Sequence, residues 1–433
     1  MEAGFSKIKI TPSIGTTMTG FIARDRERGS EGVHDDIYVR ALYLSHEEEE
    51  VLIMGFDLCF FSRGEVDRFK GAIGRKIDLA PRQILLNTSH NHVGPKVGTW
   101  QYDPPSDPVY LQAVEYAIVD AAFQARDSMV EVTLWAGATR SSVPMSRRLR
   151  LDDGTVGARP WRPSPDGEVC DALPVCLLKT PAGEPLCLLF SVSCHPSTVH
   201  GFEISADYPG VAMDHIDHFL GTTASLFLQG AGGDAKAGAI ASGDVSWRRG
   251  TWNDVEEVGT TVADEVIQVL SGSLTQVEPD LRACTVDMEW PMQPNIGRAG
   301  YEALLADPDT DHTRRLWAAE KLDWLDRGYS LPTAIPITAH GVKLGDGLRL
   351  IGLEGEAVAG LGLQILAFYE DGVTFPLGYT DGAQLYLHTS PMLDEGGYEV
   401  VSSHEYRHPA PLAEGMEAVL DDAMKTLRDN GVD

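Results

Sequence analysis

Apolar runs with the length of β-strands alternate along this chain with segments of helical periodicity. Strand-like runs at 41–44, 51–58 and 83–89 are interrupted by a helix-like segment at 65–77, and another follows at 108–126. Further strand-like runs lie at 130–137, 174–180, 185–193, 224–230, 348–355 and 373–379, and further helix-like segments at 255–270, 301–328 and 416–430. Because such an alternation packs as sheets covered by helices, we predict an α/β fold with mixed β-sheets flanked by helices.

The chain shows no internal repeat and no Ser/Gly/Pro-rich linker long enough to separate two folds. With 433 residues, 43% of them hydrophobic, it can bury a large core. We therefore predict a single domain over residues 1–433. The stretch 298–332 has helical spacing with a break near Asp307-Pro308, and it is the most insertion-like part of the sequence. We expect it to form a helical cap.

Charge and cysteine usage narrow the classes of partner and compartment. The 64 acidic residues outnumber the 35 Lys and Arg residues, which gives a net charge of −29. Such a field repels phosphate backbones and anionic lipid, so we expect neither nucleic acid nor a membrane as a partner. The six cysteines form no CxxC pair and lie mostly in apolar runs, which is typical of buried free thiols. Without a signal-peptide pattern or an apolar run of membrane-spanning length, a cytoplasmic, bacterial-type enzyme is expected.

Histidines follow two of the predicted strands. In NTSHNHVGP (87–95), His90 and His92 project from the same side if the strand continues, because side chains alternate along a strand. Neutral imidazoles on one face suit a divalent transition metal, although the same pattern fits two polar histidines at a loop entry. His195 in SCHPST stands where another strand meets a loop, and Asp207 follows in SADYPG. His195 is a candidate third ligand or a structural histidine.

A carboxylate and two phenols follow the later strands. Glu356, in LEGEAVAG, comes at the end of the run 348–355, where we expect a helix to begin. A carboxylate in a first helical turn is favourable electrostatically, and at a strand end it is also an anionic metal ligand. Tyr379 and Tyr386 lie in GYTDGAQLYLH. That segment alone would be interpreted as a loop with a short strand.

In chain order these motifs resemble those of the neutral, non-lysosomal ceramidase family. The resemblance begins with ITPSIG (10–15) and GVHDDIYVRA (32–41) and continues through NTSHNHVGP, CHPST, SADYPG, FLQGAGGD and EGE to the GY…Y segment. It implies the catalytic fold of that family and one zinc ion per chain. The implied zinc ligands are His90, His195, Glu356 and Tyr386, with Tyr379 as the alternative tyrosine.

The resemblance also implies roles around the metal. His92 is expected to contact the reacting carbonyl, with help from Tyr379, and His34 is expected in the active-site wall. Asp57, at the end of VLIMGFDL, is a candidate to orient a metal-bound histidine. The alternative is that Asp57 is a structural carboxylate at a strand end, bound by backbone N–H groups. The candidates for the general acid, which an amine leaving group requires, are His34, Asp57, His200, Asp207 and Asp234.

The substrate pocket is where this chain departs from the family. Lys236 stands where the ceramidases carry a serine, and an ammonium there suits an anionic or polar group better than a sphingoid alcohol. Arg147 and Arg148 are both candidates to pair with a substrate carboxylate, and we assign this role to Arg148. The alternative is an ion pair at the surface with Asp152 or Asp153. The substrate-binding set also includes Asp207, Asp234 and Trp100. The chain ends soon after the tyrosine segment, so we expect it to lack the C-terminal β-sandwich domain of the long ceramidases.

These observations together predict a zinc-dependent hydrolase. We expect a zinc-activated water to cleave a linear, N-acyl type amide bond in a small soluble substrate that is polar or anionic. An esterase or lactonase on the same scaffold is the alternative, and a non-catalytic binding protein is a further one. Homo-oligomerisation is left open.

Overall fold

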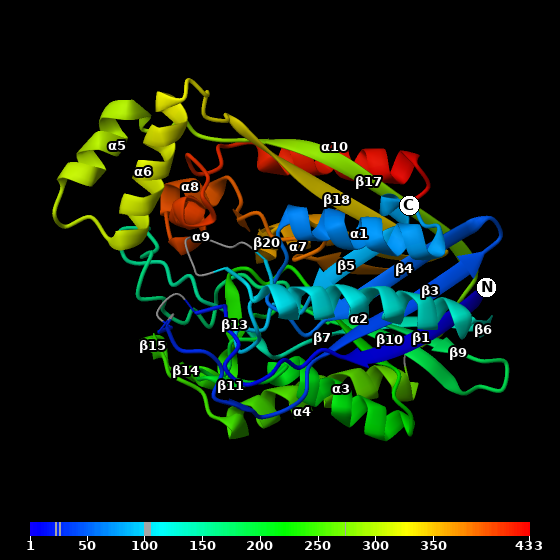
Figure 1. The fold of residues 1–433 in the computed structure, drawn as a ribbon. Helices are drawn as coiled ribbons and strands as arrows, with labels where there is room; N and C mark the ends of the chain where they lie inside the picture. The colour runs from blue at the N-terminus through cyan, green and yellow to red at the C-terminus, as the bar shows by residue number, and fades with distance from the viewer. Residues whose placement is uncertain (22–23, 26, 99–104, 273) are drawn as a thin grey trace.

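The computed structural model describes the whole chain except residues 22–23, 26, 99–104 and 273, so the predicted pocket residue Trp100 lies outside the described residues. Three β-sheets surround a shared apolar core, and helices cover their outer faces (Figure 1). This confirms the predicted fold class of mixed sheets flanked by helices. Among the described residues, no helix combines the length and the apolar composition that crossing a bilayer requires.

The first sheet contains five strands in the order β5-β4-β3-β1-β6. Its strands are β1 (Glu2–Lys9), β3 (Tyr38–His46), β4 (Glu49–Phe56), β5 (Ile84–Thr88) and β6 (Val130–Glu131). Side chains alternate cleanly between its two faces. On β4, Val51 and Ile53 point into the shared core, while Leu52 and Met54 pack under the helices α1 (Arg63–Ile77) and α2 (Pro108–Asp127). A strand with two buried faces reads as a continuous apolar run, as the sequence of β4 does.

The second and third sheets follow the same plan. The second has the order β12-β10-β9-β7-β16, and its outer face is covered by α3 (Asp207–Leu220) and α4 (Trp252–Gly272). The third has the order β17-β18-β19-β21, with α7 (Ala359–Phe368) and α10 (Met416–Asp429) on its outer face. Their strands are β7 (Thr133–Arg140), β9 (Ala172–Lys179), β10 (Pro185–Val192), β12 (Ser225–Gln229), β16 (Thr275–Val277), β17 (Pro279–Pro291), β18 (Ala334–Gly345), β19 (Leu348–Leu353) and β21 (Val373–Leu377).

Each sheet contains one parallel pair of strands, and the carboxyl ends of the three pairs meet. These pairs are β4–β5, β10–β12 and β19–β21. The side chain of Asn87, in β5, joins all three sheets at that point. Its Nδ2 donates to the carbonyl of Gly378 at 2.8 Å, and its Oδ1 accepts from the backbone N–H of Gln229 at 2.7 Å. Ligands bind at the carboxyl ends of strands in open α/β sheets, so this junction is where a site is expected.

Short strand pairs and turns extend the chain beyond the junction. They are β20 (Glu356–Ala357) with β22 (Tyr386–Leu387), β8 (Pro144–Ser146) with β13 (Ala235–Ala237), β2 (Gly32–Val33) with β11 (Glu203–Ile204), and β14 (Ala241–Ser242) with β15 (Ser246–Trp247). The short helices α8 (Pro391–Glu395) and α9 (Tyr398–Val401) and the 3-10 helices at Pro81–Gln83, Gly238–Ile240 and Ser402–Tyr406 complete the described elements. The expectation that Glu356 begins a helix is wrong, because it pairs in β20 and α7 starts only at Ala359.

The predicted helical insertion forms two helices, α5 (Gly297–Ala306) and α6 (His312–Asp326), at the end of the molecule opposite both chain termini (Figure 1). They pack against each other through Tyr301 and Trp317. Trp317 Nε1 also donates to the carbonyl of His408 at 2.7 Å. The hairpin therefore rests on the segment around 402–409, and the single-domain assignment stays a prediction.

Removal of the Asn87 side chain should loosen the junction of the three sheets. Asn87→Ala leaves the buried backbone N–H of Gln229 without its partner, which costs about 1–3 kcal/mol. The carbonyl of Gly378 loses one of two donors, because Oγ1 of Thr380 still donates to it at 3.0 Å. We expect a clearly lower midpoint of thermal unfolding, measured by circular dichroism. Asn430→Ala, at an exposed helix end, is the matched control and should leave the midpoint unchanged. Equal midpoints for the two variants would contradict the role given to Asn87.

Candidate metal centre and pocket

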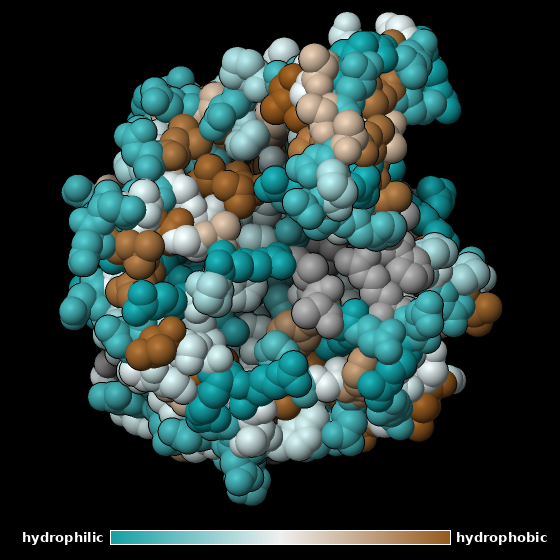
Figure 2. Space-filling model, turned by 90° about the vertical axis from the view of Figure 1, so that its left-hand side faces the viewer, coloured by the Kyte–Doolittle hydropathy of each residue, from teal (hydrophilic) through white to brown (hydrophobic). Residues whose placement is uncertain are grey.

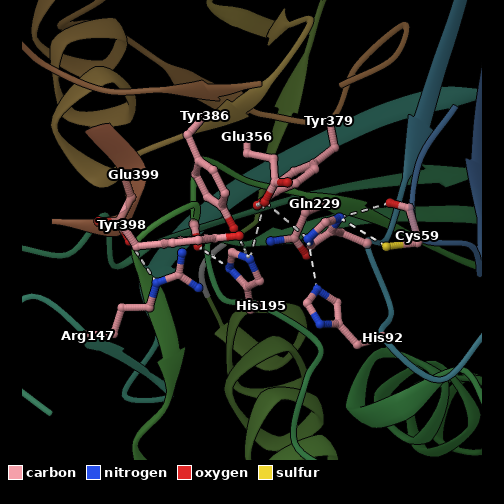
Figure 3. A network of polar contacts seen from close by, with 12 residues as sticks. Cys59, His92, Arg147, His195, Gln229, Glu356, Tyr379, Tyr386, Tyr398 and Glu399 are labelled. Atoms are coloured by element: carbon pink, nitrogen blue, oxygen red, sulfur yellow. Dashed lines mark hydrogen bonds and ion pairs between the residues drawn. The ribbon is translucent and has the colours of Figure 1, made fainter. Parts of the chain in front are cut away.

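Three donors from three different sheets converge beyond the strand junction. His90 follows β5, His195 follows β10, and Glu356 lies just after β19. One ligand atom from each lies within 4.8 Å of the other two, and all three side chains are buried. Glu356 Oε2 is 3.2 Å from Nε2 of His90 and 3.4 Å from Nε2 of His195. In Figure 3, the side chains of His195 and Glu356 reach toward the same centre.

A turn of the backbone, and not the alternation of side chains along a strand, brings His90 and His92 together. The strand β5 ends at Thr88, and His90 takes a left-handed backbone conformation with φ of 62°. This tight turn, rather than strand alternation, brings Nε2 of His92 to 3.0 Å from Nε2 of His90. Tyr379 has φ of 51° and Asp207 has φ of 55°, so the strained conformation recurs around the cluster. Non-glycine residues adopt this conformation rarely, and it concentrates at functional sites.

Backbone carbonyls orient the two ligand candidates. Nδ1 of His90 donates to the carbonyl of Cys59 at 3.0 Å, and Nδ1 of His195 donates to the carbonyl of Gly232 at 2.7 Å. With Nδ1 engaged in this way, Nε2 is left to face the centre of the cluster. Asp57, the expected orienting group, instead pairs with Arg40 at 2.8 Å, because both are buried side by side in the first sheet. The sequence holds no signal for the true partners, since every residue offers a carbonyl.

Both candidate tyrosines reach the cluster. The hydroxyl of Tyr379 lies 3.3 Å from Oε2 of Glu356, and that of Tyr386 lies 3.3 Å from Nε2 of His195. Burial, together with the Glu356 carboxylate, raises the pKa of both phenols well above the ordinary value. A third phenol, Tyr406, donates to Oε1 of Glu356. Tyr406 lies outside every motif that sequence reasoning singled out.

The charges within the cluster are strongly coupled. Burial alone would lower the pKa of His90, but the Glu356 carboxylate outweighs burial and raises this pKa to about 10. Burial lowers the pKa of His195 to about 4, and burial together with the other two imidazoles holds that of His92 well below its usual value. Glu356 therefore has one imidazolium and two neutral imidazoles as neighbours.

The donor set fits a divalent transition metal. Imidazole nitrogen and carboxylate oxygen are ligand types that zinc takes in four-coordinate sites, and the cluster offers two of the first and one of the second, with phenol oxygens nearby. Two histidines and one carboxylate also bind other first-row metals. Cys59 lies beside the same imidazoles, within a second group of donors formed with His90 and His92. The buried cluster could thus hold a metal ion.

A pocket of about 920 Å³ leads to this cluster. His90, His92 and Glu356 are among its lining residues, together with Tyr386, Tyr398 and Tyr406. Figure 2 shows the face of the molecule that lies on the left in Figure 1. The surface is hollowed near the centre of this face, and the hollow is bordered largely by hydrophilic residues. The described lining includes no residue of the α5–α6 hairpin. The expected cap therefore supports the segment that carries Tyr406 rather than forming a wall of the pocket.

The pocket wall is cationic although the chain as a whole is strongly acidic. The described lining contains two carboxylates, Asp25 and Glu356. Its cationic members are Arg24, Arg147, Arg159, Lys236, Arg248 and Arg249. Burial and the nearby Arg147 lower the pKa of Lys236 to about 8, so its side chain is still mostly charged at neutral pH. Sequence reasoning found Lys236 from its position after the Gly-rich turn, but it missed Arg24 and the loop arginines.

Several residues expected in the pocket lie elsewhere. His34 is partly exposed, pairs with Asp35 and stacks on Trp252 at 3.7 Å, because β2 carries it to the surface. Arg148 is held by Glu395 and Glu399, and it is Arg147 that lines the pocket.

The two expected acids are structural neighbours of the site. The Asp207 carboxylate accepts from the backbone N–H of Thr198 at 3.1 Å and so holds the loop that follows His195. Asp234 accepts from the N–H of Ala359 at 2.8 Å, which ties the Gly-rich turn to the start of α7. Burial raises the pKa of each carboxyl to about 6. His200 does line the pocket, stacked on Phe21 at 3.8 Å, and burial lowers its pKa to about 4.

Comparison with solved structures places this architecture. The chain has the fold of neutral ceramidase. It superposes on the neutral ceramidase of Pseudomonas aeruginosa with a TM-score of 0.74 and 14% sequence identity, over 100% of this chain and 74% of that chain. A ceramidase complexed with C2 gives a TM-score of 0.74 and 15% identity over the same shares. No family model and no curated protein matches the sequence. The expected resemblance is thus confirmed for the fold.

Metal analysis tests the cluster directly. We expect wild-type protein to bind one divalent ion per chain, measured by elemental analysis after equilibration with zinc and desalting. Glu356→Gln and His195→Ala should each weaken binding by roughly 100-fold or more, because loss of an outer partner alone costs 10–100-fold. His215→Ala, at an exposed histidine on α3, is the control and should bind as the wild type does. Equal metal content in all four proteins would rule out this cluster as the site.

Metal uptake should release a proton. With a pKa of about 10, His90 holds a proton at pH 7.5, whereas a metal requires the unprotonated nitrogen. Affinity should therefore rise as the pH increases toward 10, by about tenfold per unit for one displaced proton. Calorimetry of zinc binding in two buffers of different ionisation enthalpy measures the proton count. An observed heat that is independent of the buffer would contradict this coupling.

Proposed function

We propose that this chain is a zinc-dependent hydrolase that cleaves a linear, N-acyl type amide bond in a small, polar or anionic substrate. The observation that carries the proposal is the convergence of His90, His195 and Glu356 in a pocket large enough for such a substrate. A zinc ion held by these donors supplies Lewis acidity toward the carbonyl and activation of a water molecule near neutral pH. The fold shared with neutral ceramidase supports the same class of reaction by analogy.

His92 is suited to move the proton. Burial and the other two imidazoles hold its pKa well below the ordinary value, so the ring is neutral, and once it carries a proton it gives that proton up readily. Its Nδ1 is buried and has no hydrogen-bond partner among the described residues, which leaves this ring uncommitted to a structural role. The same ring can then return the proton to the leaving amine, which departs poorly as an anion.

Neighbouring groups hold His92 in place and supply further donors. Arg24 donates to the carbonyl of His92 at 2.9 Å, and the ring of Phe21 packs edge-on against the imidazole at 4.9 Å. Gly20 has φ of +104°, and a Cβ there would lie only 2.6 Å from Cα of His92, so only glycine permits this approach. Tyr386, protonated and beside His195, can donate to the developing oxyanion when it is not itself a ligand.

Activity on matched substrates tests this function. We expect zinc-loaded protein to hydrolyse members of a panel of N-acyl amino acids, lactones and short-chain ceramides. His92→Ala should keep its zinc but lose roughly 10²–10⁴-fold in kcat, because proton transfer by a positioned side chain contributes that much. His195→Ala should lose zinc and activity together, and His215→Ala should behave as the wild type.

The competing functions give different outcomes. Cleavage of an ester or lactone, with no cleavage of the matching amide, would indicate the esterase or lactonase alternative. Zinc-loaded protein that is inert toward the whole panel would indicate a binding protein and would contradict the proposal.

A further inference from the structure

Lys236 is a buried cation for which the described residues provide no ion pair. It lies in β13 and is 5% exposed, and its Nζ lies over two indole rings, 5.8 Å from the centroid of Trp161 and 5.4 Å from that of Trp247. Within the described part of the chain, its ammonium makes no hydrogen bond and no ion pair. A buried charge is costly unless it is paired. Because Lys236 lines the pocket, a ligand in the pocket can provide that pair.

Three N–H donors around Lys236 have no hydrogen-bond partner among the described residues, although the Arg147 guanidinium is itself paired through Nε with Glu399 at 2.9 Å. Nε1 of Trp161, Nε1 of Trp247 and Nη2 of Arg147 are all buried and have no hydrogen-bond partner among the described residues. All three side chains line the same pocket as Lys236. An indole N–H, a guanidinium and an ammonium are donors only, so they cannot satisfy one another. The missing component is a group that carries acceptor oxygens and negative charge.

These donors lie next to the candidate metal centre. His195 and Lys236 face each other in a parallel backbone bridge between their two segments. Arg147 Cζ lies 5.3 Å from the ring of Tyr386, and the hydroxyl of Tyr386 is 3.3 Å from Nε2 of His195. Figure 3 shows the Arg147 and Tyr386 side chains beside His195. An anion bound at Lys236 would therefore lie close to a carbonyl held at the cluster.

We propose that Lys236, with the indole N–H groups of Trp161 and Trp247, binds a carboxylate of the substrate. The amides cleaved here then carry a carboxylate close to the scissile bond, and N-acyl amino acids are the simplest such class. This assignment rests on the proposed hydrolase function for the cleavage step, whereas the carboxylate site itself can be tested by binding alone. The oxygens of the carboxylate accept the free N–H groups, and its charge pairs with the ammonium.

Binding of uncleavable probes tests the site without catalysis. N-(hexylsulfonyl)glycine carries a carboxylate where N-(hexylsulfonyl)ethanolamine carries a hydroxymethyl group. Both contain a sulfonamide in place of the amide, so neither can be cleaved by amide hydrolysis. We expect zinc-loaded wild-type protein to bind the glycine probe at least tenfold more tightly, by calorimetry, with a change in tryptophan fluorescence. Lys236→Met should remove this preference while binding of the neutral probe stays the same. Lys236→Arg should keep part of the preference, and Lys425→Met, at an exposed lysine on α10, should keep all of it.

Hydrolysis of N-hexanoylglycine against N-hexanoylethanolamine forms the second arm. The kcat/KM ratio of the two should favour the glycine substrate in the wild type and fall at least tenfold in Lys236→Met. Failure to cleave either one, with the binding preference intact, would reject the hydrolase function and keep the carboxylate site. Cleavage of both at equal rates, with no effect of Lys236→Met on rate or binding, would overturn the carboxylate site and keep the hydrolase function. Tighter competition by inorganic phosphate than by the glycine probe would overturn the assignment to a carboxylate.

Discussion

The hydrogen bonds of one buried amide, Asn87, hold the ends of three β-sheets together. Its donor and acceptor atoms connect β5 of the first sheet to the exits of β21 and β12 in the other two. The three candidate metal ligands lie just beyond this junction. The loops that leave the three parallel pairs carry the histidines, the glutamate and the tyrosines, so their relative positions depend on how the sheets are fixed at their ends.

Backbone strain around the metal-ligand cluster also indicates that contacts between the sheets fix the positions of its residues. His90, Tyr379 and Asp207 take left-handed conformations that the local sequence does not favour. Such conformations persist only when surrounding contacts determine them. Here the contacts are backbone carbonyls for the imidazoles and a carboxylate that accepts from two phenols. The electrostatic result is a buried acid surrounded by imidazoles, next to a pocket wall that carries the opposite sign to the protein as a whole.

Much of the fold and of the candidate metal centre could be predicted from the sequence. The features that could not be predicted have physical causes. The apolar runs predicted most strands of the three large sheets, although not β1, β16, β17 or β18, and none of the short strand pairs beyond the junction. Ordered motifs placed His90, His92, His195 and Glu356 together, because such motifs mark the ends of buried strands. Residue type and position in the sequence indicate site roles for Asp57 and His34. In the structure, Asp57 instead pairs with Arg40, and His34 stacks on Trp252. The donors Tyr406, Trp161 and Trp247 lie in a 3-10 helix, a loop and a two-residue strand, which are too short or irregular to leave a periodic signal in the sequence. Both Arg147 and Arg148 pair with Glu399, and only Arg148 also pairs with Glu395, which lies about 250 residues away in sequence, so the local sequence gives no sign of which arginine lines the pocket.

The three candidate ligands come from three separate sheets, and this has a consequence for how the protein matures. No single sheet, and no pair of sheets, offers more than two of these donors. A chain that is still folding would therefore bind metal weakly at this cluster, and only the folded protein would bind it firmly. An ion bound by all three donors would link the three sheets, so that separation of any one sheet would require its release. Metal supply in the cell would then govern the lifetime of the folded chain as well as its chemistry.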